Sequence, residues 1–314
     1  SPEVQLTALS LRPGEKARIE KALGSLDELP LYRAELDVDP VKREVTGKLF
    51  VTYVARERPM DELYLRVTAN LQERRVKLAF ANVNGRPAVL EQPEPTLYRV
   101  KLDPPAEVGV AAVVELRLTA RIPEAAADSD TLSLGGVGSK GRGADYGSFA
   151  ASPEIISLVG LLPGVPPLGA NGELVSGPSG LGDLAAFEPS NWLVSVTVPS
   201  GWKIVAPGHP LGEVPEPDGK TRFTWALACA RDYAFFATFG YEVATAKVEE
   251  ITVESLYLAA EKDAGKRVLR YATDALTELQ KKLGPYPYNT FRVLEARLTG
   301  GAGGMEFPGL VTVS

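Results

Sequence analysis

Two side chains of the types that most often act as nucleophiles, bases or zinc ligands occur only once each in the chain, Cys229 and His209. Cys229 lies in the apolar run 225–239, which predicts a buried, unreactive thiol. His209 stands between a glycine and a proline, which is typical of a turn. These counts leave too few ligands for a catalytic zinc site of the usual kind, and they exclude an intrachain disulfide.

Two glycine motifs resemble parts of nucleotide-binding signatures, but neither has the required context. Residues 136–141 match GxGxxG, yet the residues after them, 142–147, do not predict the helix whose N-terminus must receive a pyrophosphate. The Gly-Lys-Thr of 219–221 resembles the end of a P-loop, but Val214 occupies the position of that motif's first glycine. We interpret 219–221 as the tip of a hairpin, and we predict no nucleotide site.

Composition sets broad limits on the function. The chain has 314 residues, 45% hydrophobic and 24% charged, which is the balance of a globular protein of about two domains. A formal net charge of -6 without a Lys/Arg block argues against nucleic acid as a partner. We predict a soluble chain, because no stretch reaches the roughly 18 apolar residues that span a bilayer. Ser1-Pro2 resembles a trimmed end, so the sequence does not distinguish a cytoplasmic from an exported location. It also does not predict the oligomeric state.

The elements that would position any site are mostly strands. Apolar and polar side chains alternate over 31–39, 114–122 and 192–198, and turn signals such as Asn84-Gly85 and Asp218-Gly219 separate such runs. This pattern predicts a mostly β fold, with an antiparallel β-sandwich or saddle domain over residues 31–241.

Helical periodicity appears on both sides of this β domain. Residues 15–29 predict a short helix that ends before Pro30, within an N-terminal helical segment 1–30. Residues 242–314 predict the start of an α/β domain, with a helix over 261–283 between strands. This last part has about half the residues of a typical domain, and we interpret the sequence as stopping inside it.

Residues 123–190 are rich in Gly, Pro, Ala and Ser and predict few strands. A structureless loop of this length is uncommon in a compact domain unless it has a function. The segment is either a surface excursion or a binding loop.

The most informative segment stands near the C-terminus, in a run that reads Gly303-Gly304-Met305-Glu306-Phe307-Pro308-Gly309. It resembles the GxMEN signature of the aminopeptidase N family of gluzincin zinc metallopeptidases. The Leu-Gly-Pro-Tyr-Pro-Tyr of 283–288 and the Ala-Arg-Asp-Tyr-Ala-Phe of 230–235 resemble family segments that open the thermolysin-like catalytic domain and close the N-terminal β domain. The resemblance covers most of 31–314 and is most specific in the last third.

The resemblance implies a set of substrate-binding residues. Glu306 is similar to the family's amine-binding glutamate, whose carboxylate would accept charge-assisted hydrogen bonds from the α-ammonium of a peptide. Gly303 and Gly304, beside Met305, would let the peptide backbone approach the strand closely. Glu154 stands nine residues before Pro163, as a second substrate-binding acid does in the family, although the surrounding family residues are replaced.

Two departures from the family pattern bear on activity. Phe307 replaces the signature's Asn, and HExxH, which supplies zinc ligands and the general base, is absent from the sequence. The resemblance therefore implies the N-terminal portion of a zinc aminopeptidase that is inactive alone and binds no zinc itself. In the complete enzyme, the missing C-terminal catalytic region would hold the zinc and peptide N-termini would be the substrate. A non-catalytic peptide-binding or scaffold relative, and a plain β-sandwich interaction domain, are the alternatives. The preferred side chain at the cleavage site is not predicted.

Overall fold

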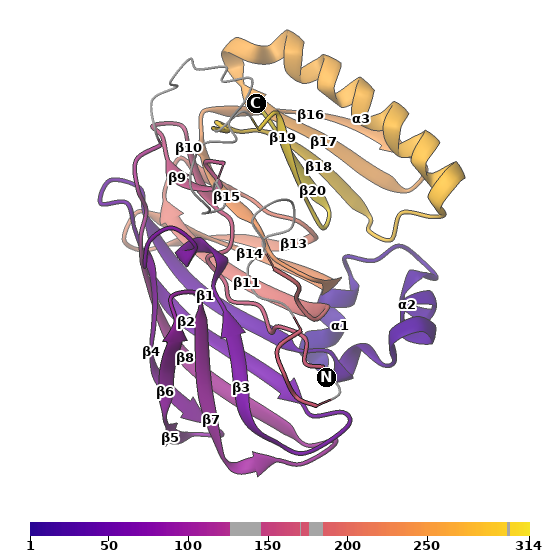
Figure 1. The fold of residues 1–314 in the computed structure, drawn as a ribbon. Helices are drawn as coiled ribbons and strands as arrows, with labels where there is room; N and C mark the ends of the chain where they lie inside the picture. The colour runs from indigo at the N-terminus through magenta and orange to yellow at the C-terminus, as the bar shows by residue number, and fades with distance from the viewer. Residues whose placement is uncertain (126–145, 170, 176–184, 300–301) are drawn as a thin grey trace, which may run out of the picture.

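The structure is a computed structural model that describes residues 1–125, 146–169, 171–175, 185–299 and 302–314. Its described strands form four sheets, and α3 covers the outer face of one of them (Figure 1). The GxGxxG match at 136–141 and much of the Gly-rich segment lie outside the described residues.

The largest sheet has eight strands in the order β13-β14-β11-β1-β2-β8-β4-β5. In chain order, its strands are β1 (Leu31–Asp39), β2 (Glu44–Val54), β4 (Val76–Val83), β5 (Arg86–Ala88), β8 (Ala111–Arg121), β11 (Ser190–Pro199), β13 (His209–Glu216) and β14 (Lys220–Ala230). The predicted alternation is confirmed: Leu116 and Leu118 are fully buried, and the residue between them is exposed. His209 opens β13 instead of occupying a turn, whereas Gly219 lies in the tight connection from β13 to β14, as predicted.

The predicted antiparallel β domain is confirmed, with one parallel exception among the paired strands that the structure describes. β1 runs parallel to β11, with Leu31 opposite Asn191 and Asp37 opposite Thr197. Alternation shows which face of a strand is buried but does not show the direction of its neighbour, so the sequence pattern could not reveal this pair.

Two smaller sheets complete the β domain. The three-stranded sheet β3-β7-β6 consists of β3 (Met60–Arg66), β6 (Leu90–Glu94) and β7 (Leu97–Ala106). The four-stranded sheet β12-β15-β10-β9 consists of β9 (Phe149–Ala151), β10 (Ile155–Leu158), β12 (Trp202–Val205) and β15 (Phe235–Phe239). Apolar side chains of all three sheets share one core cluster, which includes Leu49, Leu65 and Phe235. Sheets packed face to face around a common core are the expected architecture for this alternation.

A five-stranded sheet, β16-β17-β18-β20-β19, follows. Its elements are β16 (Tyr241–Val248), β17 (Ile251–Leu258), α3 (Lys262–Leu283), β18 (Thr290–Glu295), β19 (Gly304–Phe307) and β20 (Leu310–Val313), with a 3₁₀ turn, η3 (Ala259–Glu261), before α3. α3 ends at Gly284, whose φ of 95° favours glycine, as the sequence predicted. One apolar cluster lies between this sheet and α3, and another joins the sheet to the four-stranded sheet of the β domain.

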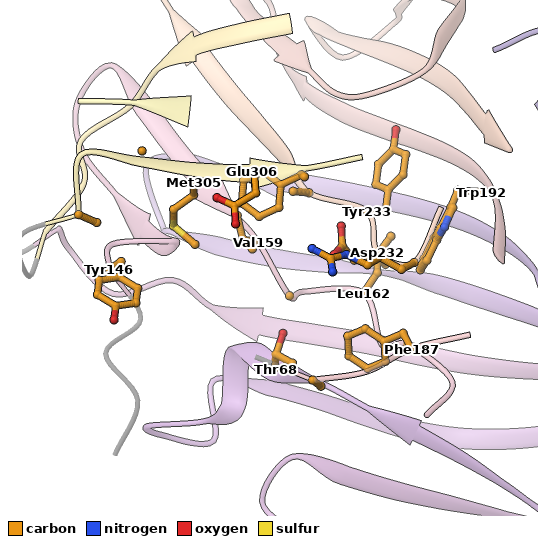
Figure 2. A pocket seen from close by; sticks show the side chains of 18 residues that line it. Thr68, Tyr146, Val159, Leu162, Phe187, Trp192, Asp232, Tyr233, Met305 and Glu306 are labelled. Atoms are coloured by element: carbon orange, nitrogen blue, oxygen red, sulfur yellow. The ribbon is translucent and has the colours of Figure 1, made fainter. Parts of the chain in front are cut away.

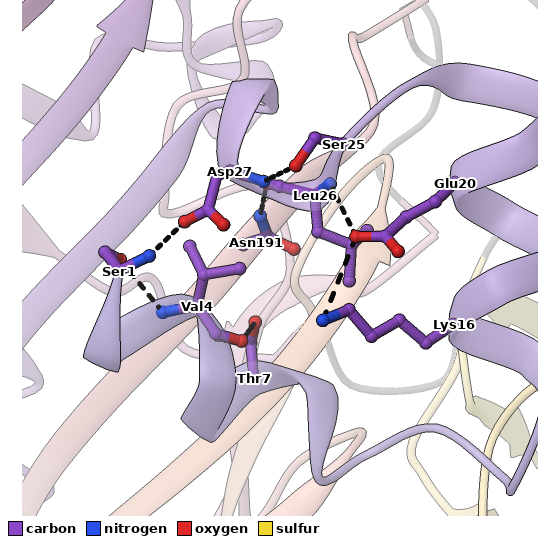
Figure 3. A network of polar contacts seen from close by, with 9 residues as sticks. All are labelled: Ser1, Val4, Thr7, Lys16, Glu20, Ser25, Leu26, Asp27 and Asn191. Atoms are coloured by element: carbon purple, nitrogen blue, oxygen red, sulfur yellow. Dashed lines mark hydrogen bonds and ion pairs between the residues drawn. The ribbon is translucent and has the colours of Figure 1, made fainter.

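The N-terminal segment contains two short helices and a 3₁₀ turn, α1 (Pro2–Ala8), α2 (Glu15–Leu23) and η1 (Leu26–Glu28). The helix predicted over 15–29 ends early because Gly24 adopts a φ of 88°. The Oγ of Ser1 caps α1 by accepting from the backbone N–H of Val4, and the carbonyl of Leu26 accepts from the side-chain Nδ2 of Asn191 on β11 (Figure 3). Another 3₁₀ turn, η2 (Thr68–Asn70), follows β3.

Arg12 ties this segment to the last sheet. Its guanidinium lies 2.6 Å from a carboxylate oxygen of Glu249 and 2.8 Å from one of Glu250, and it donates to the side chain of Gln280. The backbone amide of Arg12 also donates to the carbonyl of Pro287. The N-terminal segment therefore contacts both the β domain and the five-stranded sheet.

Candidate functional site

Glu306 lies on an edge strand. Among the described strands β19 pairs only with β20, with Glu306 opposite Val311 and Phe307 opposite Leu310. The two residues between the strands are Pro308 and Gly309, and Gly309 has a φ of 79°. Proline followed by a glycine at positive φ is typical of a type II turn, so the local sequence itself specifies this hairpin.

Side-chain alternation along β19 fixes the direction of Glu306. Met305 and Phe307 are half-buried and pack against the apolar cluster between the two sheets, and the Phe307 ring lies 6.4 Å from that of buried Phe236. Glu306 and Gly304 are exposed on the opposite face. The aromatic ring of Phe307 thus anchors the strand against the core, while the carboxylate of Glu306 remains accessible.

A cavity of about 470 Å³ lies beside β19, where the last sheet meets the β domain (Figure 2). Glu306 and Met305 line one side, and Thr68 and Phe187 lie on the opposite side, with Val159 and Leu162 between. The full set of described lining residues is Thr68, Tyr146, Val159, Gly160, Leu162, Gly164, Ala185, Phe187, Trp192, Arg231, Asp232, Tyr233, Ala234, Ala302, Gly304, Met305, Glu306 and Phe307.

Two glycines set the shape of the wall between these sides. A Cβ on Gly164 would lie 2.3 Å from the ring of Phe187, and one on Gly160 would lie 2.2 Å from the hydroxyl of Thr68. Real Cβ atoms do not approach heavy atoms so closely, so both positions require glycine for this packing. The segment 159–164 therefore lies directly against Phe187 and η2.

An arginine–aspartate pair lines the middle of the cavity. Arg231 and Asp232 lie between β14 and β15, and the guanidinium Nε lies 3.4 Å from a carboxylate oxygen of Asp232. Figure 2 shows Asp232 between Leu162 and the strand that carries Glu306, and Arg231 also lines the cavity. Sequence reasoning treated these residues only as part of a family-like segment and missed them, with Phe187, as cavity residues.

The predicted site residues are only partly brought together. Glu306, Met305 and Gly304 line the cavity, whereas Gly303 and Glu154 are not among its described lining residues. The carbonyl of Glu154 accepts from the Phe239 amide. Burial raises the pKa of Tyr241, and the negative charge of the Glu154 carboxylate also raises it. The role of Glu154 in substrate binding stays a prediction.

Cys229 is the single cysteine of the chain and therefore its one candidate for thiol chemistry. Cys229 is half-buried, not fully buried as predicted, and this burial raises the pKa of its thiol, which opposes the reactive thiolate form. Within the described part of the chain, no three His, Cys, Asp or Glu side chains come close enough to hold a metal ion. The described residues therefore do not fit a zinc centre.

Among the described helices, none is long and apolar enough to cross a membrane.

The fold is that of M1 zinc metallopeptidases. No protein-family model matches the sequence, and no curated protein matches it. The M1 zinc metallopeptidase of Deinococcus radiodurans superposes with a TM-score of 0.60 at 19% identity, over 91% of this chain and 60% of that enzyme. A mutant of that enzyme bound to a Tyr-Ser-Ala substrate superposes with a TM-score of 0.59, at 19% identity and with the same coverage. The predicted resemblance to the aminopeptidase N family is confirmed as a likeness of fold, and the chain spans 60% of the length of these enzymes.

Proposed function

We propose that this chain is the substrate-anchoring portion of a zinc-dependent aminopeptidase, and that Glu306 holds the α-ammonium of a peptide. The observation that carries this proposal is the exposed carboxylate of Glu306 on an edge strand beside a cavity. An α-amino group has a pKa near 8, so it is mostly charged at neutral pH. Its hydrogen bonds to a carboxylate are charge-assisted and therefore among the stronger kinds.

The open edge of β19 supplies the second half of the anchor. An extended peptide adds to a free strand edge through main-chain hydrogen bonds, and glycines leave room for its backbone. In this proposal Gly304, the first residue of β19, and Gly303 before it leave room for the peptide backbone. Glu154, directly before β10, would be a second carboxylate that contacts the same ammonium.

Zinc and its chemistry belong, in this proposal, to a catalytic region that packs against the last sheet. α3 packs mainly on β16, β17 and β18, whereas Phe291, Val311 and Val313 are only half-buried around the same apolar cluster. The register places Glu306 on the same face as Val311. A segment that covered this apolar face would stand next to the peptide anchor. When bound there, zinc would supply a Lewis acid and an activated water.

A non-catalytic peptide-binding relative is the second candidate. The observation in its favour is Phe307, which replaces the signature's Asn and packs in the core instead of offering an amide. Such a relative would keep the anchor and the cavity without hydrolysis.

The test uses the complete polypeptide that carries this chain, with leucine arylamide and N-acetyl-leucine arylamide as substrates. We expect zinc-dependent hydrolysis of the free amine alone, and a fall in kcat/KM of at least about tenfold in Glu306→Gln, because a charged hydrogen bond is lost. If the Glu306→Gln variant hydrolysed leucine arylamide as fast as wild type, Glu306 would not be the residue that binds the α-ammonium. Binding of leucine arylamide without turnover would favour the non-catalytic relative.

A further inference from the structure

β16 is an open edge of the five-stranded sheet, on the opposite side from β19. Among the described strands it pairs only with β17, and all eight of its residues pair in one register without a shift. The other described edge strands are shorter, contain proline or have a register shift in their pairing. Such features hinder an edge from pairing with another chain, and β16 has none of them.

Alternate residues of β16 direct their backbone groups to this open edge. Opposite residues in an antiparallel pair exchange either both backbone hydrogen bonds or neither. Thr252 is opposite Lys247, but it donates its N–H to the carbonyl of Asn289, on the far side of β17, at 2.9 Å. The N–H and C=O groups of Lys247 therefore point away from β17, and by alternation so do those of Thr245 and Val243.

The flank of α3 above this edge carries unpaired cations. The Nζ of Lys262 lies 3.3 Å from a carboxylate oxygen of Glu242 on β16, so the helical row that continues with Lys266 and Arg270 is on the β16 side. Lys266 and Arg270 are exposed, and neither forms an ion pair within the described part of the chain. The same is true of Lys247 on the edge strand itself.

A groove of about 670 Å³ lies between this flank and the end of β16. Two acidic residues line it, Glu249 and Asp274, and Glu249 already pairs with Arg12 at 2.6 Å. Lys281, another lining residue, pairs with Glu278 at 2.6 Å. The three unpaired cations around the edge are therefore opposed by one unpaired acid of the groove, which favours a ligand with negative charge.

A second copy of this chain fits the edge poorly. α3 lies over β16 and β17 (Figure 1), so two copies joined through β16 about a two-fold axis would have both α3 helices on the same face. With strands about 4.8 Å apart, the helix axes would lie about 10 Å apart, which is the distance of packed helices. The basic rows would then face each other and repel.

We propose that the open edge of β16 binds an extended, acidic segment of a partner protein. The segment pairs with β16 as an added strand, and its alternate side chains place carboxylates against the basic flank of α3. Main-chain hydrogen bonds supply affinity, and the cations select the acidic side chains. The proposal does not depend on the role of Glu306, which lies at the other edge of the sheet.

The experiment titrates the blocked peptide acetyl-Glu-Val-Glu-Val-Glu-Val-amide into the isotope-labelled 314-residue chain and follows amide hydrogen exchange by NMR. The peptide has no free amine, so the anchor proposed for α-ammonium groups does not bind it. We expect binding that weakens as salt is added. Exchange should slow at Val243 and Thr245 but change little at Ala244 and Ala246, whose N–H groups already bond to β17.

Two variants and a matched control test the contacts. Lys266→Glu reverses a charge on the basic flank, and Lys282→Glu makes the same change on the opposite flank of α3. We expect the first to weaken binding by at least about threefold and the second to leave the affinity unchanged. Thr245→Pro removes an outward N–H but no bond to β17, so it should also weaken binding while the chain stays folded.

Three results would overturn the proposal. The first is the absence of binding, or binding without slower exchange at Val243 and Thr245. The second is equal binding of the same peptide with lysine in place of each glutamate. The third is slower exchange at these two amides as the concentration of the chain rises without peptide, because a second copy would then occupy the edge.

Discussion

Arg292 on β18 shows how one buried side chain holds the last sheet to the β domain. Its Nε lies 2.7 Å from a carboxylate oxygen of Glu254, and its terminal nitrogen donates to the carbonyls of Ala206 and Gly208. Its guanidinium carbon stands 4.6 Å from the centre of the Trp225 ring. These contacts reach from the five-stranded sheet to the loop before β13, so this residue helps to fix the sheet that presents Glu306.

We predict that Arg292→Met lowers the free energy of unfolding by about 3–5 kcal/mol, because Glu254 and the carbonyl of Ala206 lose their arginine partner. Urea denaturation measures this change. The matched control is Arg222→Met, whose partly exposed ion pair with Glu216 should contribute less than about 1 kcal/mol. A similar small loss in both variants would show that Arg292 does not hold the two sheets together.

Glu188, the neighbour of Phe187, gives a prediction about pH. Burial raises the pKa of its carboxyl above the ordinary value of 4.5, and this effect outweighs the opposing ion pair with Arg56 and hydrogen bond from Tyr53. The folded chain therefore binds this proton more tightly than the unfolded chain. The stability that it contributes is present below pH 4.5 and is lost as the pH rises through the raised pKa.

The measurement is the free energy of unfolding of wild type minus that of Glu188→Gln, followed from pH 4 to about pH 7. We expect this difference to decrease as the pH rises, since glutamine does not titrate. A difference that increases with pH would mean that the ion pair with Arg56 outweighs burial and lowers the pKa of the Glu188 carboxyl.

At the scale of elements, the β19–β20 hairpin presents the carboxylate. Its turn depends on Gly309, whose φ of 79° strains any side chain and whose Cβ would lie 3.3 Å from Pro207. We predict that Gly309→Ala costs about 1–2 kcal/mol of stability. It should also weaken the binding of an amino-acid amide such as leucinamide, because β19 loses its alignment. Gly212→Ala on β13 is the control, since its Cβ would meet no heavy atom within 4 Å. Thermal unfolding of the two variants distinguishes them, and equal melting temperatures would refute the role of the turn.

Individual elements differed in how far their sequence predicted them. α3 and the Pro308-Gly309 hairpin follow from local signals, namely a long helical period with a glycine stop, and turn residues at fixed positions. α1 was not predicted, because seven residues are too few to show a helical period. The parallel pairing of β1 and β11 was also missed, since burial patterns do not encode strand direction.

At the scale of the whole molecule, the site arises where the β domain and the last sheet meet. Thr68, Phe187 and Arg231 come from separate parts of the β domain, and Glu306 comes from the far end of the chain. Local patterns carry no information about contacts over such separations. The family-like segment predicted Gly303, Gly304, Met305 and Glu306 as substrate-binding residues, and the last three line the cavity. It did not predict the opposite wall or the Arg231–Asp232 pair.

The most direct test of the central claim is a double-mutant cycle between Glu306 and the amino group of a ligand. Leucinamide and 4-methylpentanamide, which lacks the amine, are each titrated into wild type and Glu306→Gln. We predict that the amine and the carboxylate couple by at least about 1 kcal/mol, so that removal of either makes removal of the other nearly neutral. A coupling energy of zero, with leucinamide bound equally by both proteins, would contradict the claim that Glu306 holds the peptide's amino end.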